Sequence, residues 1–155
     1  MSNDELDAAD REILRLLQGD ASLSSAALGE RLALTVTACW RRRKRLEELG
    51  YITGYRAALS RARLGLGVLA FVEVRFGDQS GQSPEKFERA MQGHPEVLSC
   101  HEVSGEADYL LTVVARDLEA YGRLIERAVR RQPGVVSIKS SLALREVKAH
   151  AQLPV

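Results

Sequence analysis

The first fifty residues carry hydrophobic positions at the three- and four-residue intervals of amphipathic helices. Ile13 and Leu17 line one face of a predicted helix, which Gly19 ends. The carboxylate of Asp7 can accept the unpaired N–H groups of its first turn, and Ser24 can cap a second, shorter helix in the same way. The sequence therefore predicts a helical N-terminal segment with side-chain caps at the helix starts.

A third helix is predicted from about Val36 to Leu49. Thr35 can cap its first turn, and Gly50 can adopt the left-handed conformation that often ends a helix. Only a short turn separates this helix from the second one. Three helices with the last two joined so closely predict a helix-turn-helix.

The pattern changes after Gly50. A strand-like stretch covers 51–59 and a connector covers 60–67, so we place a domain boundary between them. The rest of the chain alternates strand and helix patterns in the order βαββαβ. Strands are predicted at 68–76, 97–104, 109–115 and 135–147, and helices at 84–92 and 118–131.

An internal repeat supports this order. A shift of 38 residues aligns Pro95 with Pro133, and it also aligns Glu88–Ala90 with Glu126–Ala128. A duplicated helix-to-strand junction is expected where two βαβ halves form one ferredoxin-like sheet with both helices on one face. Because the strand at 68–76 is apolar on both of its faces, we expect the second face to be buried against another subunit, most simply in a dimer.

Composition excludes several classes of protein. The 155 residues are 45% hydrophobic and 28% charged, which is typical of a folded globular protein, and the formal net charge is only +1. The longest apolar stretch, 64–72, is too short for a membrane helix, and the acidic first residues lack the basic segment of a secretory signal, so we expect a cytoplasmic protein. Cys39 and Cys100 have no CxxC spacing, and we expect neither a metal nor a cofactor.

With so small a net charge, affinity for nucleic acid requires local clustering, and residues 41–45 read Arg-Arg-Arg-Lys-Arg. A helical wheel puts Cys39 on a packed stripe and Thr37 and Arg41 on the opposite one. We expect Thr37, Ala38 and Arg41 to contact base edges in the major groove and the other cations to neutralise phosphates. The predicted DNA-binding residues are Thr35, Thr37, Ala38, Arg41, Arg42, Lys44 and Arg45.

A basic run on a helix is also compatible with a plain solvated surface, but the capped helix and turn before it favour DNA. Trp40, on the flank of the helix, is predicted to pack over the small core rather than to stack on bases. Cys39 is predicted to be a small buried apolar residue.

A series of short motifs follows in order along nearly the whole chain. They are Leu6-Asp7-x-x-Asp10-x-x-Ile13-Leu14, Leu34-Thr35-x-Thr37-x-Cys39, Gly50-Tyr51-Ile52-x-Gly54-Tyr55, Cys100-His101-x-Val103-Ser104-Gly105-x-x-Asp108-Tyr109 and Pro133-Gly134-Val135. Taken together and in this order they are highly specific, and with them the chain resembles the Lrp/AsnC family of feast/famine transcription regulators.

The resemblance implies an α+β fold, in which a winged helix-turn-helix with its linker strand (1–60) precedes a ferredoxin-like βαββαβ RAM domain (61–155). It implies homodimers that assemble further into tetramers or octamers and bind double-stranded DNA at a pseudo-palindromic operator. It also implies an amino-acid effector bound between dimers. The implied effector-binding residues are Val103, Ser104, Gly105, Glu106, Asp108 and Ser141. From the residues alone, Gly105 and Asp108 equally suit a plain hairpin turn.

One departure from the family pattern is Arg43, at a usually apolar position on the packed stripe, so its stem is expected to snorkel or the helix to roll slightly. The family also contains sirohaem decarboxylases, which makes a tetrapyrrole enzyme the alternative function. The sequence shows no arranged nucleophile and no phosphate-binding loop, and its recognition helix is intact. We therefore expect no catalytic residues and a sequence-specific transcriptional regulator that responds to a small amino acid.

Overall fold

The structure, a computed structural model, describes residues 5–77, 83–149 and 151–155, so the first four residues of the acidic N-terminus lie outside the described residues. The chain forms two compact units, Met1–Ala58 together with Lys148–Val155, and Leu59–Val147. The division lies close to the predicted boundary, but the last eight residues, predicted as part of the second domain, belong to the first unit. Within the described ranges, no helix has the length and apolar character needed to cross a membrane.

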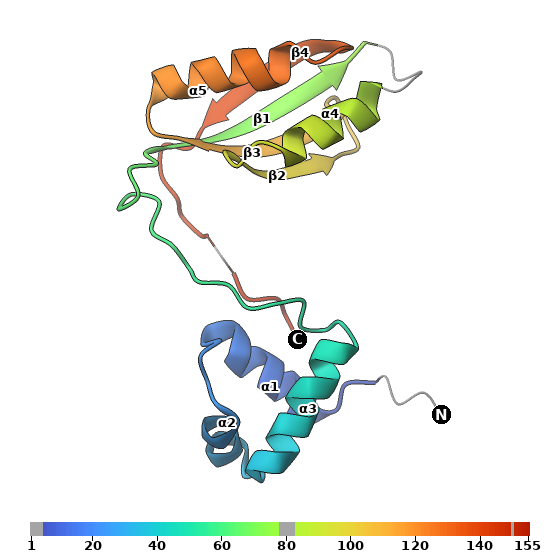
Figure 1. The fold of residues 1–155 in the computed structure, drawn as a ribbon, viewed down its shortest axis with the longest axis vertical. Helices are drawn as coiled ribbons and strands as arrows, with labels where there is room; N and C mark the ends of the chain where they lie inside the picture. The colour runs from blue at the N-terminus through green and yellow to red at the C-terminus, as the bar shows by residue number, and fades with distance from the viewer. Residues whose placement is uncertain (1–4, 78–82, 150) are drawn as a thin grey trace. The chain divides into compact units, whose positions relative to one another are not determined.

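Three helices build the first unit: α1 (Ala8–Gly19), α2 (Ser25–Leu32) and α3 (Val36–Glu48) (Figure 1). All three predicted caps are confirmed, including the one at Asp7. The Ser24 hydroxyl accepts a hydrogen bond from the Ala27 N–H at 3.1 Å, and the Thr35 hydroxyl accepts one from the Ala38 N–H at 3.1 Å. The helix starts therefore follow from local side-chain acceptors that satisfy otherwise unpaired N–H groups.

The turn between α2 and α3 is closed by unusual backbone geometry. Ala33 has a φ of 53°, which makes it the one non-glycine residue with positive φ in the described part of the chain. A Cβ atom on Gly29 would lie 2.7 Å from the main-chain oxygen of Leu34, so only glycine fits where α2 meets the turn. The predicted helix-turn-helix is confirmed, and these two residues set the direction in which α3 leaves the turn.

The core of the first unit lies between the three helices. Ile13 and Leu17 from α1 pack with Leu28 from α2 and with Cys39 and Leu46 from α3. Both α3 residues are fully buried, which confirms the predicted packed stripe and the buried state of the cysteine.

The segment after α3 does not form the strand that the sequence predicts at 51–59. A strand is stable only where a neighbouring strand pairs with its main chain, and none is described in the first unit. The segment is instead tied to α3, because the Ile52 N–H donates to the Leu46 oxygen at 3.1 Å and the Tyr55 hydroxyl donates to Glu47 Oε1 at 2.9 Å.

The last residues of the chain run along α1. Gln18 donates to the main-chain oxygen of Leu153 at 3.2 Å and accepts from its N–H at 2.6 Å, and Arg15 Nη2 donates to the main-chain oxygen of Val155 at 2.6 Å. The Val155 side chain packs against the core. These contacts place the tail in the first unit, and no periodicity in its sequence signals them.

The second unit is a four-stranded antiparallel sheet in the order β2-β3-β1-β4 with two helices (Figure 1). Its strands are β1 (Val68–Phe76), β2 (Val97–Glu102), β3 (Tyr109–Ala115) and β4 (Val135–Leu142). Its helices are α4 (Ser83–Gln92) and α5 (Leu118–Leu124), and α5 continues as a π-helical segment, η1 (Ile125–Arg130). The predicted βαββαβ order is confirmed.

Alternate residues of β1 separate the two faces of the sheet. Ala70, Val72 and Val74 are fully buried in one cluster with Phe87 of α4 and Leu124 of α5, so both helices cover the same face. Phe71, on the opposite face, keeps 42% of its surface exposed. The expectation that this open face is covered by another subunit stays a prediction.

The two halves repeat the same junction, as the sequence predicts. The Val97 N–H donates to the His94 oxygen at 3.0 Å, and 38 residues later the Val135 N–H donates to the Gln132 oxygen at 3.3 Å. β4 ends earlier than the predicted residue 147, because its pairing with β1 runs out where the Ala143 N–H bonds to the Leu69 oxygen.

Candidate nucleic-acid interface and effector loop

One face of α3 turns to solvent and carries the predicted base-contact residues. Thr37, Arg41 and Lys44 are exposed on the side opposite Cys39, Thr35 is exposed at the cap, and Ala38 is half-buried. Neither Arg41 nor Lys44 has an ion-pair partner among the residues that the structure describes. The structure thus brings the five residues together on α3, and two of them, Arg41 and Lys44, have side-chain N–H groups that form no ion pair with the described protein.

Arg42 and Arg45, predicted to neutralise DNA phosphates, turn toward α1 instead. Arg42 Nη1 donates to Asp10 Oδ1 at 2.8 Å and to Asp7 Oδ2 at 2.6 Å, and Arg45 Nη2 donates to Asp10 Oδ2 at 2.5 Å. We call these four side chains, Asp7, Asp10, Arg42 and Arg45, the carboxylate clamp.

Asp10 is fully buried, and no other charged residue is buried in the described part of the chain. It also completes a capping box, since the Asp10 N–H donates to Asp7 Oδ1 at 2.8 Å and the Asp7 N–H donates to Asp10 Oδ2 at 3.2 Å. A buried carboxylate is tolerated only when such partners satisfy its oxygens. The clamp therefore fixes α3 against α1 and determines which face of α3 remains exposed.

The clamp also shifts the titration of its members. The pKa of Arg42 is raised, first by its hydrogen bond to Asp10 and then by the one to Asp7. The pKa of Asp7 is lowered from 3.8, mainly by the hydrogen bond from the Asp10 N–H and further by Arg42. A carboxyl group whose pKa is lowered on folding stabilises the protein above its ordinary pKa, and this contribution is lost as the pH falls toward the lowered value. Asp7 and Arg42 are therefore both charged at neutral pH.

Arg43, the departure from the family pattern, has a defined place. Its guanidinium lies 4.6 Å above the Tyr55 ring, Nε donates to the Tyr55 hydroxyl at 2.8 Å, and Nη1 donates to the Leu23 oxygen at 3.0 Å. The side chain is half-buried, as expected for a snorkelling stem. Arg43 thus joins α3 to the loop before α2 and to the extended segment after α3.

The prediction that Trp40 packs over the core is wrong. The ring is 56% exposed, and Val36, one turn earlier on α3, is 54% exposed. Cys39 and Leu46 already fill the contact with α1 and α2, and a residue next to Cys39 is rotated by about 100° away from it. Val36 and Trp40 form an exposed apolar strip beside Thr37 and Arg41.

The predicted effector loop is a hairpin between β2 and β3. The Val103 N–H donates to the Asp108 oxygen at 2.9 Å, and Gly105 has a φ of 130°, which glycine alone adopts freely. Asp108, one of the implied effector-binding residues, receives the Phe76 N–H on Oδ2 at 2.6 Å. Asp108 therefore pins the hairpin to β1, while Ser104 and Glu106 are exposed.

A small cavity of about 150 Å³ lies beside this hairpin. The cavity carries both signs of charge. Its lining residues are Glu106 and Ala107 of the hairpin, Glu73, Val74 and Arg75 of β1, and Ser137 and Lys139 of β4. Lys139 Nζ lies 3.7 Å from Glu73 Oε2. Sequence reasoning missed the β1 and β4 residues, because only the strand register places Glu73 opposite Lys139 and Arg75 opposite Ser137.

Ser141 is not in this cavity. It pairs with Phe71 on β1, four residues along β4 from Ser137, which corresponds to about 13 Å. Within one chain, the structure does not bring Ser141 to the other predicted effector residues.

Other chemistry finds little support in the described residues. They contain no group of three or more His, Cys, Asp or Glu residues that could hold a metal ion. Burial raises the pKa of the Cys100 thiol, which disfavours the reactive thiolate.

Two family models match the chain. The winged helix-turn-helix DNA-binding model matches residues 6–53, and the Lrp/AsnC ligand-binding domain model matches residues 69–153. Among curated proteins, the chain is 39% identical to the DNA-binding transcriptional activator DecR of Escherichia coli over 97% of this chain and 99% of that one. It is 40% identical to the Bkd operon transcriptional regulator of Pseudomonas aeruginosa, over 97% of this chain and 98% of that one.

Solved structures agree. A transcriptional regulator of Neisseria meningitidis in complex with L-Met superposes with a TM-score of 0.93 at 36% identity, over 97% of both chains. An AsnC family transcriptional regulator from Agrobacterium tumefaciens superposes with a TM-score of 0.90 at 34% identity, over 96% of this chain and 97% of that one. All four relatives are transcriptional regulators, so the alternative of a tetrapyrrole enzyme has no support among them.

The clamp predicts a large loss of stability for Asp10→Asn, which leaves Arg42 and Arg45 without the carboxylate that they share. Breaking a buried ion pair costs about 3–5 kcal/mol. The single tryptophan lies on α3, so urea unfolding followed by its fluorescence reports on this unit.

The matched control is Glu12→Gln, which removes the charge of an exposed side chain on the same helix, paired with Arg15. It should change the free energy of unfolding by less than about 1 kcal/mol. An Asp10→Asn protein as stable as this control contradicts the structural role of the clamp.

Proposed function

Because the chain belongs to the Lrp/AsnC family of DNA-binding transcriptional regulators, we propose that it reads a pseudo-palindromic operator through the exposed face of α3. The observation that carries the proposal is that the five cations of the helix differ in their ion pairing. Arg42 and Arg45 are held by the buried carboxylate of Asp10, whereas Arg41 and Lys44 are exposed without an ion-pair partner in the described chain.

In this proposal the N-terminal half of α3 lies in the major groove. The Arg41 guanidinium donates two hydrogen bonds to a guanine edge, and the Thr37 methyl group and Ala38 contact thymine methyl groups. Lys44 binds a phosphate, and the Thr35 N-cap directs the helix N-terminus, with its partial positive charge, toward the backbone. The apolar strip of Val36 and Trp40 covers the adjacent sugar edge.

Arg42 and Arg45 take a second role in this arrangement. Their main contribution is to position α3 through their hydrogen bonds to Asp10. The sequence predicts that Arg42, Lys44 and Arg45 all contact phosphates. In this proposal Lys44 makes the direct phosphate contact, and Arg42 and Arg45 are positioning residues.

We further propose a homodimer formed through the open face of the sheet. Phe71 on β1 is exposed there beside half-buried Leu69 and Leu110, an apolar surface that a second copy would cover. Two-fold symmetry then places two copies of α3 on two half-sites, which accounts for a pseudo-palindromic operator. We also propose assembly into tetramers or octamers, which sedimentation equilibrium measures, and a cytoplasmic location, which a DNA-binding regulator requires.

The effector in this proposal is a small amino acid bound at the β2–β3 hairpin. The structure of the relative from N. meningitidis is a complex with L-Met, and the cavity beside the hairpin offers both signs of charge that a zwitterion needs. Glu106 accepts from the α-ammonium group and Lys139 or Arg75 receives the carboxylate, while exposed hairpin N–H groups near Ser104 and Gly105 add donors.

Val103 and Asp108 shape the hairpin rather than contact the ligand, since they close it through their main-chain hydrogen bond. Ser141 contributes from a neighbouring subunit in this proposal, because it does not line the cavity of its own chain. A ligand held between subunits is linked to assembly: it favours the oligomer that forms the better site.

Operator selection tests the DNA half of the proposal. Duplexes selected from a random pool by the full chain should bind tightly, and Arg41→Ala should lose about 1–3 kcal/mol of discrimination between the selected operator and a scrambled duplex. The control is Arg11→Ala, an exposed cation on α1, which should leave this discrimination unchanged. Equal discrimination by Arg41→Ala and Arg11→Ala would show that α3 does not read the bases in this way.

A thermal-shift screen of the twenty amino acids tests the effector half. A ligand present at 100 times its Kd stabilises the folded state by about 2.7 kcal/mol and raises the melting temperature. Glu106→Gln should abolish the shift without changing the melting temperature of the free protein, whereas Asp108→Asn should lower the latter because it loosens the bond to Phe76. No shift with any amino acid, or an undiminished shift in Glu106→Gln, rejects the proposed site.

A further inference from the structure

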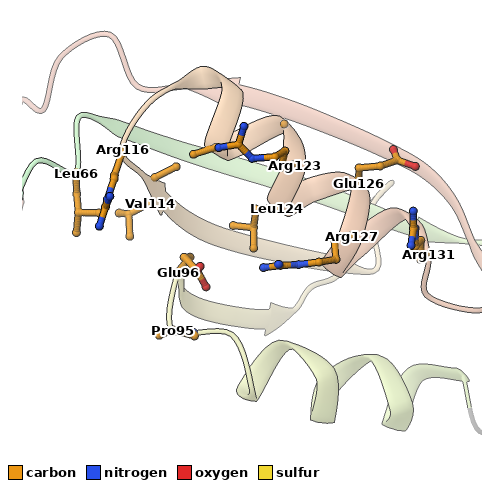
Figure 2. Close-up of a pocket in the computed structure, with 13 residues that line it drawn as sticks. Leu66, Pro95, Glu96, Val114, Arg116, Arg123, Leu124, Glu126, Arg127 and Arg131 are labelled. Atoms are coloured by element: carbon orange, nitrogen blue, oxygen red, sulfur yellow. The ribbon is translucent and has the colours of Figure 1, made fainter.

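A second cavity lies in the second unit, away from the effector hairpin. Its volume is about 1000 Å³, and it lies between η1, the end of β3 and the turn before β2 (Figure 2). It opens at the Ala115 end of β3, whereas the hairpin joins the Tyr109 end, about 20 Å away. The two sites are therefore separate within one chain.

The lining combines an apolar floor with a basic wall. Val114 and Leu124 are buried and Leu66 is half-buried, which gives the floor an apolar surface. The wall carries four arginines, Arg116, Arg123, Arg127 and Arg131, against two glutamates, Glu96 and Glu126. Figure 2 shows Arg116, Arg123 and Arg127 extending over the same hollow.

The excess positive charge is not neutralised by the protein. Arg123 pairs with Glu119, and Glu126 pairs with Arg130 at 2.9 Å, so the second glutamate is already engaged by a cation outside the cavity. Arg116, Arg127 and Arg131 have no ion-pair partner among the described residues. Like charges held this close are unfavourable unless an anion lies between them.

The internal repeat provides a built-in comparison. Positions 123, 127 and 131 correspond to Glu85, Arg89 and Gly93 in the first half of the unit. There the arginine pairs with a glutamate of its own helix, with Arg89 Nη2 3.9 Å from Glu85 Oε2. The basic face is therefore present in the second half alone. It includes Arg127 of the π-helical segment η1, and π-helical geometry is rare and often found at functional sites.

We propose that this cavity binds a small organic anion, with a carboxylate or phosphate group held by Arg116 and Arg127 and an apolar portion lying on Val114 and Leu124. Guanidinium groups bind such oxyanions through two parallel hydrogen bonds. A cavity of this size accommodates a small molecule, and its apolar floor suits an organic ligand rather than the phosphate backbone of a duplex. Glu96 adds one acceptor for a donor group of the ligand.

Isothermal titration of the full chain with phenyl phosphate, phenylacetate and neutral benzyl alcohol tests the proposal and separates its two oxyanions. At least one of the two anions should bind saturably with one site per chain, and benzyl alcohol should not. The double variant Arg116→Gln with Arg127→Gln should raise the Kd at least about tenfold. Both residues are exposed, and the melting temperature of each variant shows that it is folded.

The matched control is Arg89→Gln, which removes the equivalent arginine of the other half and should leave the Kd unchanged. Absence of saturable binding by both anions, or equal effects of the double variant and the control, overturns the proposal. The proposal is also overturned if the double variant keeps its affinity for the anions but binds duplex DNA more weakly or sediments with a different mass. The surface would then be a DNA contact or a subunit contact.

Discussion

A buried carboxylate determines what the first unit presents to solvent. Asp10 has no exposed surface, and Arg42, Arg45 and the Asp7 N–H bind its two oxygens there. Two of the five cations on α3 are thereby directed inward. These contacts fix the rotation of α3 about its axis, which places Thr37, Arg41 and Lys44 on the outer face. The turn at Ala33 and the close contact at Gly29 fix the direction of the helix from its other end.

The second unit separates its tasks by position on one sheet. One face is covered by α4 and α5 and supplies the stable core, and the other is open for the proposed subunit contact. The effector hairpin lies at one end of β2 and β3, and the basic cavity lies at the other. Both proposed sites lie at the ends of strands and on loops, so ligand binding at either requires no rearrangement of the core.

Local rules predicted most of the fold. The caps at Asp7, Ser24 and Thr35 each depend on nearby residues, and all are present in the structure. The strand predicted at 51–59 is wrong, because β propensity without a pairing partner does not make a strand. Trp40 is wrong for a related reason: the general tendency of tryptophan to be buried says nothing about whether a small core still has room.

The site was predicted only in part. A helical wheel identifies the exposed positions Thr37 and Arg41, but it cannot show that Arg42 and Arg45 bind a carboxylate more than thirty residues earlier. Cross-strand register likewise decides that Ser137 and Lys139 face the hairpin cavity and that Ser141 does not. Long-range pairings of this kind leave no periodic trace in the sequence.

The central claim is that α3 divides its cations between the protein and DNA, and the salt dependence of binding measures this division most directly. Each phosphate contact contributes about 0.9 to the slope of log K against log salt concentration. The account predicts that Lys44→Ala lowers the magnitude of this slope by about 0.9, the contribution of one phosphate contact. Arg42→Ala should lower the stability of the first unit, but the slope measured for the folded Arg42→Ala protein should be nearly unchanged. Equal reductions of the slope in both variants would contradict it.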